Sequence, residues 1–178
     1  DGCDRFDEPN GEDCSRFALE VFLKTIYPEA LDTYGTGYIE VRIIRDQDGK
    51  CFESRWYHST DEVLDDYDAL TAKAKELSAC LMFSPALRTR REGTRAAVLG
   101  SWCIWADQSR QVDEQTASSV RDRTSHLSFN WVACAGAIHW YVVLNRLCTD
   151  VTKIERGNQL LGNLWGGNGV QDASGVMR

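Results

Sequence analysis

The sequence predicts an α+β fold built on a largely antiparallel sheet. Two patterns carry this prediction: a strand–turn–strand pattern follows the first helical segment, and a second group of alternating apolar segments precedes the last one. Of the 178 residues, 43% are hydrophobic and 26% are charged, which is typical of a globular domain. We therefore expect a polar extension over residues 1–14 and one domain over residues 15–178.

The first half of the chain predicts a helix, a hairpin and a second helix. Apolar residues recur at helical spacing from Ser15 until Pro28, and one face of this helix holds Phe17, Val21, Phe22 and Ile26. Residues 38–44 alternate and are rich in β-branched side chains, Asp48-Gly49 predicts a turn, and residues 51–57 predict the return strand. Ser59 and Glu62 form a capping box that opens a helix extending to Leu81.

The second half predicts strands and a last helix. Strands are expected over residues 79–84, 97–106, 127–134 and 137–144. The last helix is expected over residues 150–164, with Val151, Ile154, Leu161 and Leu164 facing inward, although its two glycines weaken it. Trp102, Trp105 and Trp165 are expected in the core.

Charge and cysteine usage limit the classes of protein. The formal net charge of −7 excludes a wholly basic protein that coats nucleic acid, but four arginines gather within residues 88–95. The seven cysteines are an odd number and cannot all pair within the chain. No apolar run is long enough to cross a bilayer, and the acidic N-terminus does not resemble a signal peptide. We therefore expect a cytoplasmic protein without membrane contact.

Three groups of residues could carry chemistry. Asp107 ends an apolar strand, where a carboxylate either caps the strand or binds a hard cation such as Mg²⁺. His139 lies within an apolar strand after several small residues, so it is either a structural histidine or a ligand contact. The arginines of residues 88–95 form either a solvated loop or a site that binds phosphate groups through charge-assisted hydrogen bonds.

The order of these features resembles a known family. It comprises YIEVR (38–42), LMFSPALRTRREGTR (81–95), a strand ending in WAD (105–107), the small residues before His139, and GGNGVQDASGVMR (166–178). Over residues 17–178 this order is similar to the prim-pol domain of the archaeo-eukaryotic primase superfamily, as found in plasmid and phage replication proteins. The resemblance implies a prim-pol fold, with a mixed or antiparallel, RRM-like central sheet flanked by helices. The closing motif of the family is cut short at Arg178.

The resemblance also implies roles for particular residues. Asp107 would be catalytic and would bind Mg²⁺ or Mn²⁺, and His139 would be catalytic and contact the nucleotide. The arginines that would contact the nucleotide are Arg42, Arg88, Arg91, Arg95 and Arg178.

This sequence departs from the family pattern at its metal-binding positions. Ser109 stands where the second acid of an Asp-x-Asp motif is expected, and Asn168 replaces the acid of a Gly-Gly-Asp stretch. Alanines at positions 135 and 137 replace the two glycines of the histidine motif. Two of three expected carboxylates are therefore neutral, which predicts weak binding of divalent ions.

The resemblance and the departures leave two functions open. The first is a DNA primase–polymerase that transfers nucleotides under the direction of a template, with attenuated activity. The second is a catalytically inactive prim-pol fold that serves as a nucleotide-binding, single-strand-binding or adaptor module. The implied partners are nucleoside triphosphates, single-stranded or primed DNA, and a fused or associated helicase.

Overall fold

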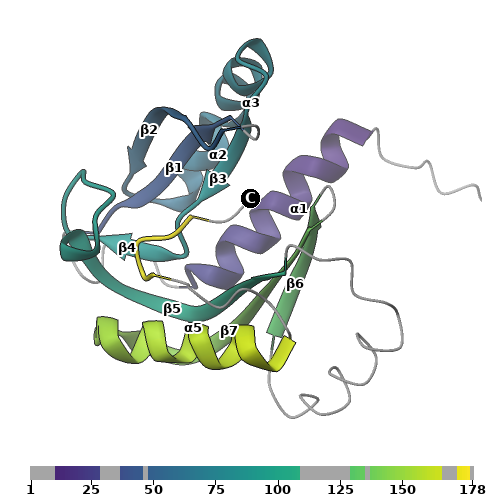
Figure 1. The fold of residues 1–178 in the computed structure, drawn as a ribbon. Coiled ribbons are helices and arrows are strands. Elements are labelled where there is room, and N and C mark those ends of the chain that lie inside the picture. Colours follow the sequence, from purple (N-terminus) through teal and green to yellow (C-terminus); the bar gives the residue numbers. More distant parts are fainter. Residues whose placement is uncertain are drawn as a thin grey trace, which may run out of the picture.

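The computed structural model describes residues 11–28, 37–45, 48–108, 129–134, 137–165 and 172–176 (Figure 1). The α+β class and the flanking helices expected from the sequence are confirmed. In chain order the elements are α1 (Gly11–Ile26), β1 (Ile39–Ile44), β2 (Cys51–Tyr57), α2 (Thr60–Asp65), α3 (Tyr67–Glu76), β3 (Cys80–Phe83), β4 (Ala86–Arg88), a 3-10 turn (Arg95–Ala97), β5 (Val98–Gln108), β6 (Phe129–Cys134), β7 (Ala137–Cys148) and α5 (Val151–Trp165).

The described strands form two antiparallel sheets rather than the one central sheet that we expected. The first has the order β2-β1-β3 and the second the order β4-β5-β7-β6. Within the described part of the chain, a single bridge between Tyr38 and Arg88 connects them. The short strand β4 was missed because its three residues are too few to show alternation. The predicted hairpin is confirmed, and its turn is closed by backbone hydrogen bonds between Arg45 and both Gly49 and Lys50.

Helix α1 joins the two sheets. It begins at Gly11, within the segment expected to be an extension. The ring of Phe22 packs edge-on against Phe83 of β3 and Tyr141 of β7, with centroid distances of 6.3 and 5.2 Å. Leu23 and Ile26 are fully buried, whereas Phe17 and Val21, nearer the start of the helix, are 67% and 49% exposed.

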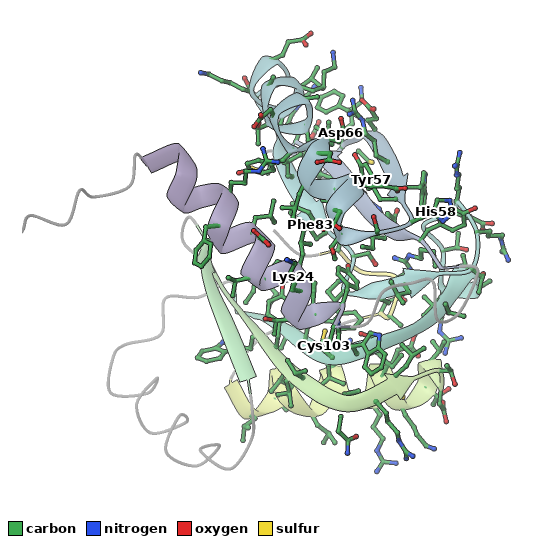
Figure 2. The ribbon with its side chains drawn as sticks, turned by 180° about the vertical axis from the view of Figure 1, so that it is seen from behind. Lys24, Tyr57, His58, Asp66, Phe83 and Cys103 are labelled. Carbon is green, nitrogen blue, oxygen red and sulfur yellow. The ribbon has the colours of Figure 1, made fainter. Side chains whose placement is uncertain are left out.

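The helix expected over residues 59–81 is interrupted at Asp66. The capping box is confirmed at its start, where Ser59 Oγ accepts a hydrogen bond from the Glu62 backbone. Asp66 ends α2 and begins α3, and its carboxylate accepts hydrogen bonds from Tyr57 and Arg55 of β2 (Figure 2). The helix thus breaks at the residue that is hydrogen-bonded to β2, and the helical spacing of apolar residues does not predict this break.

Helix α5 covers one face of the second sheet (Figure 1). It packs directly on β5, because a Cβ atom at Gly157 would lie 2.8 Å from Ile104 Cγ2. The glycine that weakens the helix in the sequence therefore permits this contact. Ile154 and Leu161 face inward as expected, but Leu164 is 42% exposed, so its predicted inward position was wrong.

Two of the three tryptophans expected in the core, Trp102 and Trp105, lie there. Trp105 is fully buried and Trp102 is 5% exposed, as predicted. The side chain of Trp165 lies outside the described residues. Among the residues that the structure describes, no helix has the length and apolar character needed to span a membrane.

Candidate functional site

Asp107 and His139 lie opposite each other on neighbouring strands. They are direct partners in the antiparallel register of β5 and β7, so both side chains point to the same face of the sheet. The distance from His139 Nε2 to Asp107 Oδ1 is 3.7 Å. We refer to these two residues as the Asp107–His139 pair.

The pair lies on the face of the sheet that α5 does not cover. Trp105 and Tyr141 belong to the main core beside α1. They lie two residues from Asp107 and His139 on their strands and therefore on the same face as the pair. The opposite face carries Ile104 and Ala106, which pack with residues of α5. The pair therefore lies where this face leaves the core and reaches the end of β5.

The two members of the pair differ in exposure. The side chain of His139 is 5% exposed and that of Asp107 is 40% exposed. Within Asp107, however, Oδ1 is buried and accepts no hydrogen bond from any described residue. A buried carboxylate oxygen without a donor favours binding of a cation or of a hydrogen-bond donor from outside the chain.

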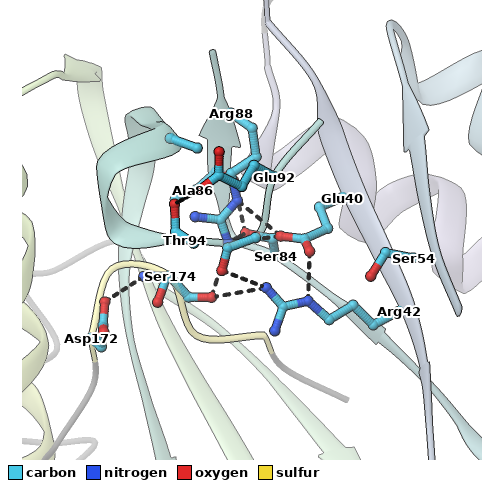
Figure 3. Close-up of polar contacts among 12 residues, drawn as sticks. Glu40, Arg42, Ser54, Ser84, Ala86, Arg88, Glu92, Thr94, Asp172 and Ser174 are labelled. Carbon is cyan, nitrogen blue, oxygen red and sulfur yellow. Dashed lines mark hydrogen bonds and ion pairs between the residues drawn. The ribbon is translucent and has the colours of Figure 1, made fainter. Parts of the chain in front are cut away.

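A second group of polar residues is buried where the two sheets meet. The carboxylate of Glu40 is fully buried and accepts hydrogen bonds from Arg42 Nε at 2.6 Å and from Arg88 Nε at 2.9 Å (Figure 3). Arg88 is also fully buried and donates from Nη2 to Ser84 Oγ at 2.8 Å. We call Glu40, Arg42 and Arg88 the buried ion cluster.

The buried ion cluster carries one more positive than negative charge. Burial lowers the pKa of Arg88, whereas the charge of Glu40 opposes this shift. Among the described residues, Nη1 of Arg88 has no hydrogen-bond partner. The loop after β4 lies directly over the cluster, because a Cβ atom at Gly93 would lie 2.3 Å from Arg42 Nη2 and 2.6 Å from Glu40 Oε1.

The segment of residues 172–176 closes the cluster from the other side. The carbonyl oxygen of Ser174 accepts hydrogen bonds from Arg88 Nη2 at 2.9 Å and from Arg42 Nη2 at 3.5 Å (Figure 3). The neighbouring Ala173 is fully buried in the main core. Two arginines that the family resemblance assigns to the nucleotide thus hold a segment of this chain in place.

The remaining arginines point elsewhere. Arg95 makes two hydrogen bonds, of 2.6 and 2.8 Å, with the carboxylate of Glu155 on α5. Arg91 lies over the ring of Tyr38, with its Cζ atom 5.5 Å from the ring centroid. The arginines of residues 88–95 therefore do not converge on one point in the described structure.

Sequence reasoning missed Glu40, Ser84 and Ser174. A signal for Glu40 was present, because Glu40 and Arg42 stand two residues apart on a strand and therefore share a face. No comparable signal exists for Ser174, whose contact with Arg88 spans 86 residues.

Three predicted positions, Ser109, Asn168 and Arg178, lie outside the described residues. Among the residues that are described, no group of three or more histidine, cysteine, aspartate or glutamate side chains could hold a metal ion.

Comparison of the fold with solved structures finds one clear likeness. The chain is similar to the AEP domain of the primase-polymerase (PrimPol) of cyanophage S-2L, with a TM-score of 0.58 and 14% sequence identity. The match covers 86% of this chain and 82% of that domain. No family model and no curated protein matches the sequence. At this identity the likeness concerns the fold, and it agrees with the prim-pol fold expected from the sequence.

Proposed function

We propose that this chain is a primase–polymerase-like domain that binds a nucleoside triphosphate and a DNA template and transfers nucleotides with attenuated activity. The observation that carries the proposal is the Asp107–His139 pair, which lies on the face of the second sheet that α5 does not cover, in a fold similar to that of a phage primase-polymerase. We further propose that the chain acts in plasmid- or phage-type DNA replication, with a fused or associated helicase as a partner.

The donor atoms of the pair fit a divalent ion that takes its other ligands from a bound nucleotide. Mg²⁺ and Mn²⁺ prefer oxygen ligands, and Mg²⁺ is held by as few as one or two carboxylates together with phosphate oxygens. Asp107 would hold the ion, since its Oδ1 atom lacks a donor among the described residues. A bound divalent ion would supply positive charge that offsets the charge of the triphosphate.

His139 is suited to contact the same nucleotide. Its ring and the carboxylate of Asp107 are 3.7 Å apart on one face, so a single phosphate group can reach both side chains. The imidazole is nearly buried between its neighbours in the sheet, which limits its rotation. A donor held rigidly in this way stabilises developing charge without reorganising during the reaction.

Arg42 and Arg88 support the site in a different way. Direct contact of either residue with a phosphate would require that a phosphate oxygen replace the carbonyl oxygen of Ser174. In the described arrangement they hold the segment of residues 172–176 instead. We therefore propose that Arg42 and Arg88 position this segment, and that His139 makes the nucleotide contact.

The residues at positions 109 and 168 are the reason for proposing attenuated activity. Serine and asparagine can bind a hard cation through oxygen, but they bring no negative charge. A site meant for two dications therefore lacks two charges. The same observation favours the second candidate, a nucleotide-binding or single-strand-binding module without catalysis.

Primer extension with a labelled primer and template tests the proposal. We expect weak extension in Mg²⁺, more extension in Mn²⁺, and a gain of activity in the double variant Ser109→Asp, Asn168→Asp. Titration calorimetry should show tighter binding of divalent ions by the same variant, because two carboxylates have been added. Adding Asp107→Asn to the double variant should abolish the gain.

The outcomes separate the two candidates. Nucleotide binding without extension, in the parent chain and in the double variant, would establish the binding module and overturn the catalytic proposal. Full activity of the parent chain in Mg²⁺ would mean that other residues complete the metal site. A folded double variant without tighter metal binding would mean that positions 107, 109 and 168 do not converge.

A further inference from the structure

One face of the β1–β2 hairpin carries aromatic side chains that the core does not use. Ile39, Val41 and Ile43 of β1 point into the core, so the alternate residues point to the other face. The register pairs Trp56 with Glu40, which puts Trp56 on this second face. Tyr38 precedes the buried Ile39 and therefore lies on the same side.

The ring of Tyr38 is in contact with His58 and Arg91. The rings of Tyr38 and His58 have centroids 4.6 Å apart and are inclined by 44°. The guanidinium of Arg91 lies over the ring of Tyr38. His58 and Arg91 are exposed and Tyr38 and Trp56 are half-buried, so all four reach the surface (His58 in Figure 2). We call these four residues the aromatic–arginine patch.

Arg91 supplies the positive charge of the patch, and the carboxylate of Glu62 lies beside the patch, where it accepts a hydrogen bond from the His58 backbone. Of the four arginines in residues 88–95, Arg88 is fully buried against Glu40. Arg90 pairs with Glu92 and Arg95 with Glu155, whereas Arg91 contacts an aromatic ring. A guanidinium that lies over an aromatic ring keeps N–H groups at its own edge, where they can bind phosphate.

The patch is separate from the Asp107–His139 pair. Tyr38 is bridged to Arg88, which is paired with Val98 at the start of β5. Asp107 lies nine residues further along β5. This corresponds to about 30 Å of extended strand. A ligand at the patch would therefore not be the nucleotide held by the pair, but a longer chain could contact both.

We infer that the aromatic–arginine patch binds single-stranded nucleic acid, with unpaired bases stacked on its rings and phosphates next to Arg91. Rings beside a cationic group bind single strands because every unpaired base offers a flat π face. A duplex hides these faces in its base stack, and a folded protein partner offers few of them. The identification of the strand as the template rests on the proposed function, whereas binding itself does not.

Fluorescence anisotropy with a labelled oligothymidylate of about 16 nucleotides tests the inference, since this length spans one single-strand site. His58→Ala and Trp56→Ala should each weaken binding about 5- to 150-fold, the range expected for the loss of one stacked base. Arg91→Ala should weaken binding and reduce its salt dependence. Tyr38→Phe should bind like the parent, because only the ring is required.

Matched controls lie elsewhere on the chain. Phe17 is 67% exposed on α1, and Arg156 is exposed on α5. Phe17→Ala and Arg156→Ala should leave oligonucleotide affinity unchanged. His58→Ala removes an exposed side chain, so its circular dichroism and thermal melting should match those of the parent and keep the test valid if Trp56→Ala destabilises the fold.

Several results would overturn the inference. The first is a parent chain that fails to bind the oligonucleotide, and the second is an equal loss of oligonucleotide affinity in the patch and control variants. The third is a duplex of the same length that competes as well as the single strand does. Failure of the proposed function would look different. The patch variants would still lose oligonucleotide binding, but no variant would extend a primer or bind a nucleoside triphosphate.

Discussion

Replacing Glu40 with glutamine should strongly destabilise the protein. The two carboxylate oxygens of Glu40 accept from Arg42 and from Arg88, and both Glu40 and Arg88 are fully buried. In the Glu40→Gln variant an NH₂ group replaces one of these oxygens and faces a guanidinium donor. The remaining charge on Arg88 is then buried without a counterion.

The expected loss follows from this burial. Breaking a buried ion pair by removing one partner costs about 3–5 kcal/mol, because the other charge stays desolvated. For a chain of this size each kcal/mol corresponds to about 2–4 °C in the melting temperature, which gives a decrease of about 6–20 °C. Urea denaturation followed by circular dichroism, together with thermal melting, measures both quantities.

A matched control is available on the neighbouring strand. Glu53 pairs with Arg55, but their side chains are 36% and 29% exposed. Glu53→Gln should therefore cost less than about 1 kcal/mol. The double variant Glu40→Leu, Arg88→Met should be more stable than Glu40→Leu alone, since it removes the unpaired charge. A Glu40→Gln variant as stable as Glu53→Gln would refute the account of the buried ion cluster.

Two further changes test how the helices pack against the strands. Burial is the largest single influence on the pKa of Asp66 and raises it, but hydrogen bonds from Tyr57 and Arg55 together lower it below the ordinary value. The Asp66 carboxylate therefore stabilises the protein above about pH 4, and this stabilisation is lost as the pH falls through the lowered pKa. Asp66→Asn should consequently reduce the free energy of unfolding at neutral pH and reduce it less in acid. Gly157→Ala should destabilise the protein, in contrast to the gain of about 1 kcal/mol that this change gives in an exposed helix. The change should be tolerated in a variant that also carries Ile104→Ala, because the clash with Ile104 is then removed. Equal melting temperatures for the parent and Gly157→Ala would contradict the close contact of α5 with β5.

The sequence alone determined several local elements. The β1–β2 hairpin and its turn follow from alternation and from Asp48-Gly49, and the start of α2 follows from the capping box. These features depend on contacts between residues that are near in sequence or on a strict period of two, which a single sequence displays.

Only the tertiary structure decided which arginines are exposed. Residues 88–95 look like one cationic loop in the sequence, yet Arg88 is fully buried against Glu40 and Arg95 is bound to α5. The partners of Arg88 are 48 and 86 residues away, and nothing in the local pattern indicates them. Burial and pairing of a charge depend on how distant segments pack, because the cost of desolvation arises only when other elements exclude water from it.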